Sequence, residues 1–275
     1  MSYSFSMTSQ TKVLLIGIDG LILQRAIDSG RAATLATLRA DSYFSEMVID
    51  MPTVSGPSWT TLLTGVTQQI HRVIDNDYRD HNLTAAPDLL TQAATLNPGT
   101  STYAAAGWPP LIDPSHVGPV IRTRNEDQNS GVHSIFVRDG ETNGYETVDL
   151  EVAHDAVRTI REIAPDVSFV YFCGADEAGH LHGTLEGSYF DAIERIDGLV
   201  AQLHQAILVR HQMHDEKWLI VITTDHGHRD EGGHGGDSPQ ERASFVIAHG
   251  VGMHHPSWPA QIKPEELVGQ ILSTL

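Results

Sequence analysis

The sequence has very little cysteine, few basic residues and no long hydrophobic run. Its single cysteine, Cys173, excludes a disulfide within the chain and favours a reducing compartment. The first apolar stretch, residues 13–18, is too short for a signal sequence or a membrane span, and no basic segment precedes it. We therefore expect a cytoplasmic protein without a membrane partner.

The shortage of basic residues bears on the class of ligand. Lysine and arginine number 17 against 35 aspartates and glutamates, which gives a net charge of −18. Because phosphate contacts dominate affinity for nucleic acid, this balance argues against a nucleic-acid polymer as partner. A small anionic substrate remains compatible if bound cations supply positive charge locally. The sequence does not indicate an oligomeric state.

The hydrophobic pattern predicts one α/β domain over residues 1–275. Short, continuous apolar runs are typical of buried parallel strands, and segments with helical periodicity separate them. The expected strands are residues 13–18, 47–49, 167–172, 218–222 and 244–248. We predict a mostly parallel central sheet with helices on both faces. Residues 98–150, rich in Gly, Pro and Asn, are expected to form loops and a small cap.

Polar residues follow several of these strands. Asp19, Ser55, Asp176 and Asp225 each come just after a predicted strand. In open α/β sheets, ligands bind outside the carboxyl ends of the strands. These four side chains are therefore expected to converge on one crevice.

Histidines accompany the aspartates at spacings that suit metal binding. His180 follows Asp176 by four residues, so one helical turn places both on the same side. His226 is adjacent to Asp225, and His234 lies among glycines that allow close backbone approach. Such ligands suit zinc, with manganese or iron as alternatives. Each pair alone also fits a capped turn, but their joint placement indicates a metal site.

The same residues carry a family resemblance. The matching segments are IGIDGL, PTVSGPSWTTLLTG, VIDN, DEAGHLHG and TTDHGH, which lie in this order between residues 12 and 248. In these segments the chain resembles the type I phosphodiesterase/nucleotide pyrophosphatase family of the alkaline phosphatase superfamily. The resemblance implies an alkaline-phosphatase-like fold, two divalent metal ions and a small phosphorylated substrate, which can be a nucleotide.

The resemblance also assigns the metal ligands. One ion would be held by Asp19, Ser55, Asp225 and His226. The other would be held by Asp176, His180 and His234. Many family members place the last of these ligands further downstream, so three later histidines are alternatives: His249, His254 and His255. The glycine-rich setting favours His234.

Ser55 is the expected nucleophile. A serine hydroxyl is weak at neutral pH unless a base or a metal activates it, and coordination to the first metal would do so. We expect in-line attack on phosphorus and a phosphoserine intermediate, between two metals about 4 Å apart. Backbone N–H groups at the helix start would face the phosphoryl oxygens. The alternative for Ser55 is a helix N-cap.

Substrate contacts are expected from Ser58, Trp59 and Arg72. Ser58 takes the position where phosphodiesterase relatives usually carry an Asn, and Arg72 a position where they often carry Gly. Trp59 and Trp108 would stack on a flat leaving group. The alternatives are a surface charge for Arg72 and core packing for both tryptophans.

Three other functions compete. A phosphomonoesterase or phosphomutase needs more positive charge around its dianionic substrate, and only Arg72 offers it. The sulfatase signature, x-P-S-R after the nucleophile, is broken here because Trp59 replaces the arginine. A non-catalytic metal-binding protein is disfavoured because a closed structural site needs no serine beside its ligands.

Overall fold

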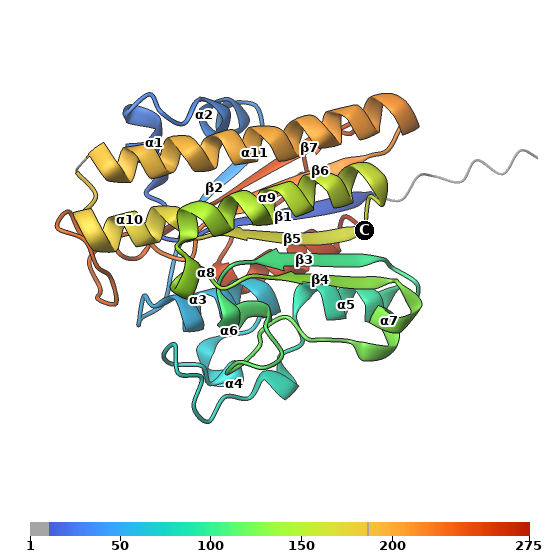
Figure 1. Ribbon diagram of the computed structural model, residues 1–275, viewed down its shortest axis with the longest axis horizontal. Helices are drawn as coiled ribbons and strands as arrows, with labels where there is room; N and C mark the ends of the chain where they lie inside the picture. The colour runs from blue at the N-terminus through green and yellow to red at the C-terminus, as the bar shows by residue number, and fades with distance from the viewer. Residues whose placement is uncertain (1–10, 186) are drawn as a thin grey trace, which may run out of the picture.

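The computed structural model describes residues 11–185 and 187–275. Residues 1–10, where the sequence lacks a basic signal region, lie outside the described part. A seven-stranded sheet forms the centre, with helices on both faces (Figure 1). Within the described ranges, no helix is both long and apolar enough to cross a membrane.

The sheet has the strand order β2-β7-β6-β1-β5-β3-β4. The strands are β1 (Lys12–Ile18), β2 (Tyr43–Val48), β3 (Thr102–Ala106), β4 (His133–Val137), β5 (Val167–Phe172), β6 (Trp218–Thr223) and β7 (Ala243–Val251). Strand β7 is antiparallel to its neighbours β2 and β6, whereas the other pairs are parallel. The predicted mostly parallel sheet is confirmed.

Each face of the sheet is covered by its own group of helices. In the upper part of Figure 1 lie α1 (Leu23–Asp28), α2 (Ala33–Ala40), α9 (Tyr145–Glu162) and α11 (Gly187–His214). Helix α10 (Gly174–His182) lies at the left, beyond the ends of the strands, and packs into the same core as α9 and α11. Below the sheet lie α3 (Ser55–Thr64), α4 (Gln68–His71), α5 (Leu89–Leu96), α6 (Pro109–Ile112) and α7 (Asn125–Ser130). The remaining helices are α8 (Gly140–Asn143), α12 (Leu267–Leu272) and two short 3₁₀ turns, η1 (Leu83–Ala85) and η2 (Pro264–Glu266).

The central strands are buried on both faces, which explains their continuous apolar sequences. Leu14 and Ile16 of β1 pack into the core under α9 and α11. Val13 and Leu15, which point the other way, belong to the core that includes residues of α3, α5 and α12. Two hydrophobic cores therefore hold the sheet in place between two helical layers.

The structure differs from the sequence prediction over residues 98–150. This segment contributes β3 and β4, which extend the central sheet beyond β5, and is therefore not merely loops and a cap. Three of the five residues of β3, TYAAA, are alanines, so its apolar signal is weak although the strand is fully buried. Between β1 and β2 the chain forms two short helices, α1 and α2, because it turns at Gly30, whose φ is +74°.

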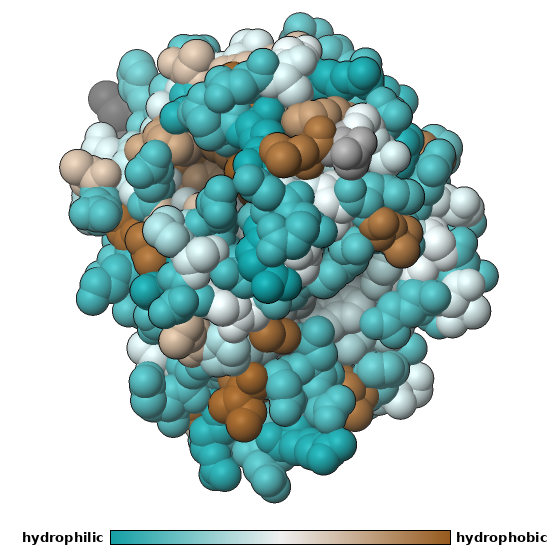
Figure 2. Space-filling view, turned by 90° about the vertical axis from the view of Figure 1, so that its left-hand side faces the viewer, coloured by the Kyte–Doolittle hydropathy of each residue, from teal (hydrophilic) through white to brown (hydrophobic). Residues whose placement is uncertain are grey.

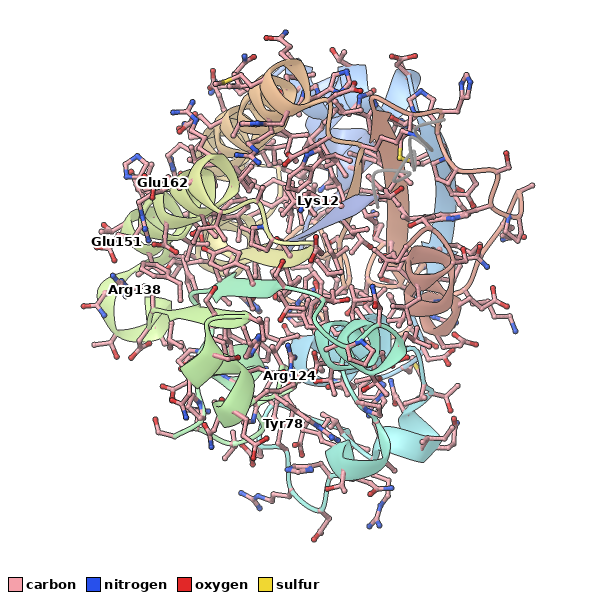
Figure 3. The ribbon with its side chains drawn as sticks, turned by 90° about the vertical axis from the view of Figure 1, so that its right-hand side faces the viewer. Lys12, Tyr78, Arg124, Arg138, Glu151 and Glu162 are labelled. Atoms are coloured by element: carbon pink, nitrogen blue, oxygen red, sulfur yellow. The ribbon has the colours of Figure 1, made fainter. Side chains whose placement is uncertain are left out.

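At the end of the sheet where β1 begins, Lys12 makes contacts that stabilise the fold. Lys12 starts β1, and its Nζ donates to Asp166 at 2.9 Å and to the carbonyl of Ala164 at 2.7 Å. Figure 3 views this side, with Lys12 near the ends of the strands. These contacts tie the start of β1 to the segment that leads into β5. The predicted functional residues lie at the opposite edge.

Candidate active site

All seven predicted metal ligands lie where parallel strands end. Asp19 follows β1, Asp176 and His180 lie on α10 after β5, and Asp225 and His226 follow β6. Ser55 begins α3, and His234 lies in the loop before β7. Figure 2 faces the side on which β1 ends; its surface is largely hydrophilic, with small separate hydrophobic patches. The predicted convergence at one edge is present.

Asp19, Ser55, Asp225 and His226 form a first cluster, and all four are buried. The Nε2 of His226 lies 3.4 Å from Asp19 Oδ1, 3.2 Å from Asp225 Oδ2 and 3.2 Å from Ser55 Oγ. Those two carboxylate oxygens have no hydrogen-bond partner among the described residues. Buried oxygens left unpaired around one point are what a bound cation would satisfy, so this donor set fits a divalent metal.

Asp176, His180 and His234 form a second cluster. Asp176 Oδ1 lies 3.6 Å from His180 Nε2 and 3.5 Å from His234 Nε2, and the two nitrogens are 3.0 Å apart. The Nδ1 of His234 lies 2.7 Å from the carbonyl of Thr53, to which it donates. Its Nε2 lone pair therefore faces the cluster, which is the usual arrangement of a histidine metal ligand. This set also fits a divalent cation.

Burial favours the protonated form of the three site aspartates, and repulsion from other aspartates adds to it at Asp19 and Asp225. Burial raises the pKa of Asp19 to about 7, and the nearby Asp176 carboxylate adds to the shift. Burial raises the pKa of Asp176 to about 6 and that of Asp225 well above its usual range. Bound cations would keep all three ionised at neutral pH. His234 also suits metal binding, because burial lowers its pKa to about 4 and leaves its imidazole neutral at neutral pH.

Trp59 supports Asp19 and does not reach the substrate cavity. Its indole N–H donates to Asp19 Oδ2 at 2.8 Å, and the hydroxyl of Tyr171 donates to the same oxygen at 2.6 Å. The indole is fully buried, so it has no surface on which a leaving group could stack. These two bonds hold the carboxylate with Oδ1 directed at the first cluster. The core-packing alternative therefore describes Trp59 better, and its N–H also orients Asp19.

Ser55 is held at the start of α3. Val54 occupies the N-cap position, so Ser55 does not act as the cap. The next backbone N–H, from Gly56, donates to Asn76 Oδ1 at 2.7 Å. The sequence predicted that N–H groups here would face a phosphoryl oxygen, but that of Gly56 is already bonded to Asn76. Asn76 belongs to the VIDN segment, but its contact with Gly56 was not predicted.

A cavity of about 300 Å³ opens between the two clusters. Ser55, Asp19, Asp176, His180 and His234 line it. Its other lining residues are Asn76, Trp108, Glu141, Tyr145, Tyr171, Cys173, Glu177 and Leu181. Trp108 thus fits the expected place beside a substrate, and its indole N–H donates to Glu141 at 3.1 Å. Several of these residues come from the segment 98–150.

Ser58 and Arg72, both predicted to contact substrate, do not line this cavity. Ser58 is buried and faces a separate small space beside Ile49 and Pro264. Arg72 is exposed and follows α4 with a φ of +58°. The surface-charge alternative therefore describes Arg72 better.

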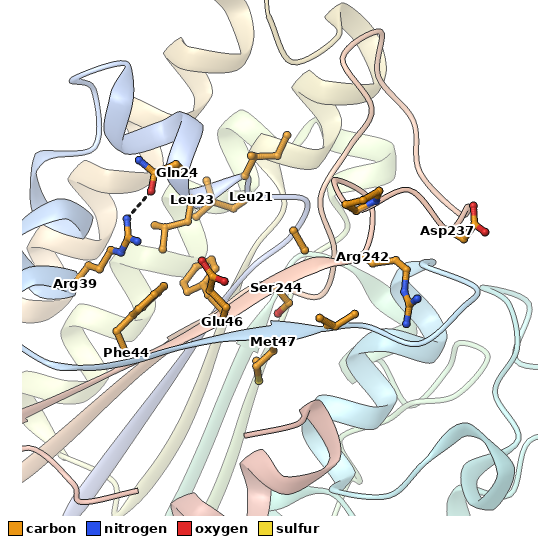
Figure 4. A pocket seen from close by; sticks show the side chains of 15 residues that line it. Leu21, Leu23, Gln24, Arg39, Phe44, Glu46, Met47, Asp237, Arg242 and Ser244 are labelled. Atoms are coloured by element: carbon orange, nitrogen blue, oxygen red, sulfur yellow. Dashed lines mark hydrogen bonds between the residues drawn. The ribbon is translucent and has the colours of Figure 1, made fainter. Parts of the chain in front are cut away.

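The rival histidines lie elsewhere. His249 and His255 group with Asp41, and the Nδ1 of His249 lies 2.9 Å from Ser42 Oγ. A larger, mainly apolar cavity of about 450 Å³ lies between the start of α1 and the edge of the sheet at β2 and β7 (Figure 4). None of the seven predicted ligands lines it. Among the described histidines that the sequence offered, His234 is the one that joins Asp176 and His180.

Sequence reasoning missed His228, two residues after His226. Its side chain is fully buried, and its Nε2 lies 2.8 Å from Asp176 Oδ1. The alternation of His226 and His228 in TTDHGH was the available signal.

Comparison with known proteins identifies the family. The family model of type I phosphodiesterase / nucleotide pyrophosphatase matches residues 13–238, which include both clusters. The chain belongs to this family. The predicted family resemblance is thereby confirmed, and members of the type I phosphodiesterase family act on phosphate esters in a metal-dependent manner.

Solved structures share the alkaline-phosphatase-like fold. Murine ectonucleotide pyrophosphatase / phosphodiesterase 5, in an inactive form with AMP, aligns over 96% of this chain and 95% of its own, with a TM-score of 0.66 and 14% identity. A 2-O GAG sulfatase gives a TM-score of 0.70 with 13% identity, covering 96% and 70% of the two chains. Phosphonoacetate hydrolase from Sinorhizobium meliloti gives 0.58 with 17% identity, covering 82% and 59%. At these identities the likeness shows the fold alone.

Curated relatives include GPI ethanolamine phosphate transferases. Transferase 2 of Candida glabrata is 27% identical over 71% of this chain and 22% of its own length. Transferase 1 of Yarrowia lipolytica is 24% identical over 89% of this chain and 27% of its own length. The type I phosphodiesterase chain described here thus spans about a quarter of the length of these relatives.

Proposed function

We propose that the chain hydrolyses phosphate diesters at a two-metal site, with Ser55 as the nucleophile. The observation that carries this proposal is the position of Ser55 Oγ. It lies within the first cluster, 3.2 Å from His226 Nε2, and Ser55 lines the cavity that residues of the second cluster also line. Membership of the type I phosphodiesterase family supports action on phosphate esters.

Two ligand sets would hold the cations. Asp19, Asp225 and His226, with Ser55 beside them, suit one divalent ion, and the second cluster, next to which His228 lies, suits the other. Zinc is the first expectation from carboxylate and imidazole ligands, with manganese or iron as alternatives. When bound, such ions polarise phosphoryl oxygens and lower the pKa of a coordinated hydroxyl.

The residues of the chain define the steps. Ser55, deprotonated with its proton lost to solvent, attacks phosphorus in line; the Oγ–P bond forms while the bond to the leaving oxygen breaks. The resulting phosphoserine is then attacked by water, which restores the serine and releases the phosphorylated product. Asn76 accepts from Gly56 through Oδ1. This bond leaves its amide N–H groups to donate to a phosphoryl oxygen in the cavity.

The cavity walls favour a particular substrate charge. Glu141 and Glu177 line the cavity, and no lysine or arginine of the described chain does. A dianionic monoester or a polyphosphate would meet these carboxylates unfavourably, which disfavours the phosphomonoesterase alternative and nucleotide polyphosphates. A diester with an amine-bearing substituent would place its cation near these carboxylates and the rings of Trp108 and Tyr145.

A second candidate function follows from the same charges. The relatives named GPI ethanolamine phosphate transferases support transfer of an ethanolamine phosphate group. In that case an alcohol, not water, would take the phosphoryl group from Ser55. Product analysis with and without an added alcohol acceptor separates hydrolysis from transfer.

The nucleophile is tested by Ser55→Ala. We expect turnover of an aryl phosphate diester to fall at least about 10³-fold, because the attacking oxygen is removed. Metal content, measured by elemental analysis, should show that both ions can still bind. Ser58→Ala, on the same helix but outside the cavity, is the matched control and should keep its rate. Full turnover by Ser55→Ala with metals bound would refute the mechanism.

The substrate class is tested by comparing aryl esters that share a leaving group. We expect the ethanolamine phosphate diester to be cleaved faster than the nucleotide diester, the phosphate monoester and the sulfate. Glu177→Gln should lower kcat/KM for the amine-bearing diester about tenfold and leave that for the nucleotide diester unchanged or higher. Equal losses on both diesters would show that Glu177 does not select the amine.

A further inference from the structure

His228 lies against the second cluster but plays no part in the predicted ligand set. Its Nε2 is 2.8 Å from Asp176 Oδ1. That same oxygen is the one closest to His180 and His234, at 3.6 and 3.5 Å from their Nε2 atoms. His228 thus contacts the oxygen through which Asp176 would bind a cation.

Two glycines make room for the His228 ring. A Cβ at Gly20 would lie 2.6 Å from His228 Nε2, and a Cβ at Gly179 would lie 2.9 Å from its Cε1. Gly20 also has a φ of +63°, which by itself favours glycine. Gly179 has no positive φ, so contact with the His228 ring is what excludes a larger side chain there. The imidazole therefore occupies a closely fitted slot between the β1 loop and α10.

The hydrogen bonds of the ring indicate which nitrogen carries the proton. A histidine that binds metal through one nitrogen normally donates the other N–H to an acceptor, as His234 does to Thr53. The Nδ1 of His228 is buried and has no hydrogen-bond partner among the described residues. A proton there would be an unpaired buried donor, which is unfavourable. The proton therefore belongs on Nε2, where Asp176 accepts it.

We infer that His228 is a positioning residue for the second metal site. Its Nε2–H donates to Asp176 Oδ1 and fixes the direction of that carboxylate, and His228 does not itself bind the metal. The inference rests on the proposed function, since it presumes a cation at Asp176, His180 and His234. It assigns a supporting role to a side chain outside the predicted ligand set.

Three variants test this role. The amide N–H of Gln reaches about as far as Nε2, so His228→Gln keeps a donor to Asp176. His228→Leu fills the slot without a donor, and His228→Asn carries a donor that is too short. Binding of Zn²⁺ and Co²⁺ to each metal-free protein is measured by titration, and the Co²⁺ proteins are compared by visible absorption.

We expect the Leu and Asn variants to bind the second ion 10- to 100-fold more weakly, as is typical when an outer hydrogen bond to a ligand is lost. The first ion should bind with unchanged affinity, which also shows that the variants fold. His228→Gln should recover most of the affinity. At saturating Co²⁺, band positions and intensities should match those of the unmodified protein, because the number of ligands is the same.

Two results would overturn the inference. Unchanged affinity for the second ion in both the Leu and Asn variants would show that the bond to Asp176 does not matter. A Co²⁺ spectrum at saturation with changed band positions or intensities in the Leu, Asn and Gln variants would show a lost ligand, and His228 would then bind the metal directly. Failure of the proposed function looks different: the unmodified protein itself would bind no second ion, and the inference would fall with it.

Discussion

His234 contacts both ligand clusters. Its Nε2 faces Asp176 and His180, while its ring stacks on His226 of the first cluster. We predict that His234→Ala reduces bound metal from two ions per chain to one, because the second cluster loses a ligand that its neighbours cannot replace. Elemental analysis after dialysis measures this change.

The matched control is His249→Ala, since His249 lies apart with Asp41 and Ser42. This variant should retain both ions. The assignment fails if His234→Ala still binds two ions or if His249→Ala binds only one.

At the residue scale, the sequence predicts ligands better than their supporting contacts. Asp225 and His226 are recognisable from the sequence because two metal-binding side chains directly follow a strongly apolar strand segment. The contacts of Trp59 with Asp19 and of His228 with Asp176 join segments far apart in the sequence. No local pattern encodes such a contact, because it exists only after the strands pair. For that reason the sequence offered substrate stacking or core packing for Trp59 without indicating Asp19 as its partner, and it gave no role to His228.

Among the elements, the packing of α3 on β1 matters most for the site. Gly17 of β1 lies against Trp59 of α3, and a Cβ there would lie 2.5 Å from the indole Cη2 and 2.8 Å from Cζ3. Gly17→Ala should lower the free energy of unfolding by about 1–3 kcal/mol through overpacking. Because the indole that donates to Asp19 would have to shift, the first metal should also bind more weakly. Chemical denaturation and metal titration measure the two effects.

Gly198→Ala provides the comparison for that variant. Gly198 lies on the exposed side of α11, and a Cβ there meets no described atom within 4 Å. Since alanine favours helix, its stability should stay unchanged or rise by up to about 1 kcal/mol. If Gly17→Ala were as stable as Gly198→Ala, the close packing of Trp59 on β1 would be disproved.

At the same scale, the strands were predictable where they are rich in large apolar residues. The segments VSFVYF and WLIVIT mark β5 and β6 without ambiguity. The strands β3 and β4 were missed because one consists mainly of alanine and the other lies half-buried at the sheet edge. Burial of a small residue leaves little trace in hydrophobicity, so the sheet is wider than the sequence suggests.

On the scale of the whole molecule, metal binding depends on pH because the buried site aspartates take up protons. The raised pKa values, about 7 for Asp19 and about 6 for Asp176, mean that both carboxyls hold protons in the metal-free protein at low pH. A cation must displace these protons, so its affinity rises with pH through this range and then levels off. The buried histidines add little, since His234, with a pKa of about 4, is already neutral there.

We therefore predict that added Zn²⁺ raises Tm more at pH 8 than at pH 5.5. The measurement is thermal unfolding with and without Zn²⁺ at each pH, so the pH dependence of the metal-free protein cancels. A chelator should remove the difference. An equal rise in Tm at both pH values would show that these carboxyls are ionised without metal.

The cytoplasmic location and the absence of a membrane partner stay predictions of the sequence.

The stacked rings of His226 and His234, with centroids 3.7 Å apart and planes at 23°, have a mechanical consequence. Each ring belongs to a different ligand set, so the stack couples the two sets directly. A displacement of one imidazole would therefore disturb the other. A substrate that shifted the ligands of one cation would also alter the setting of the second.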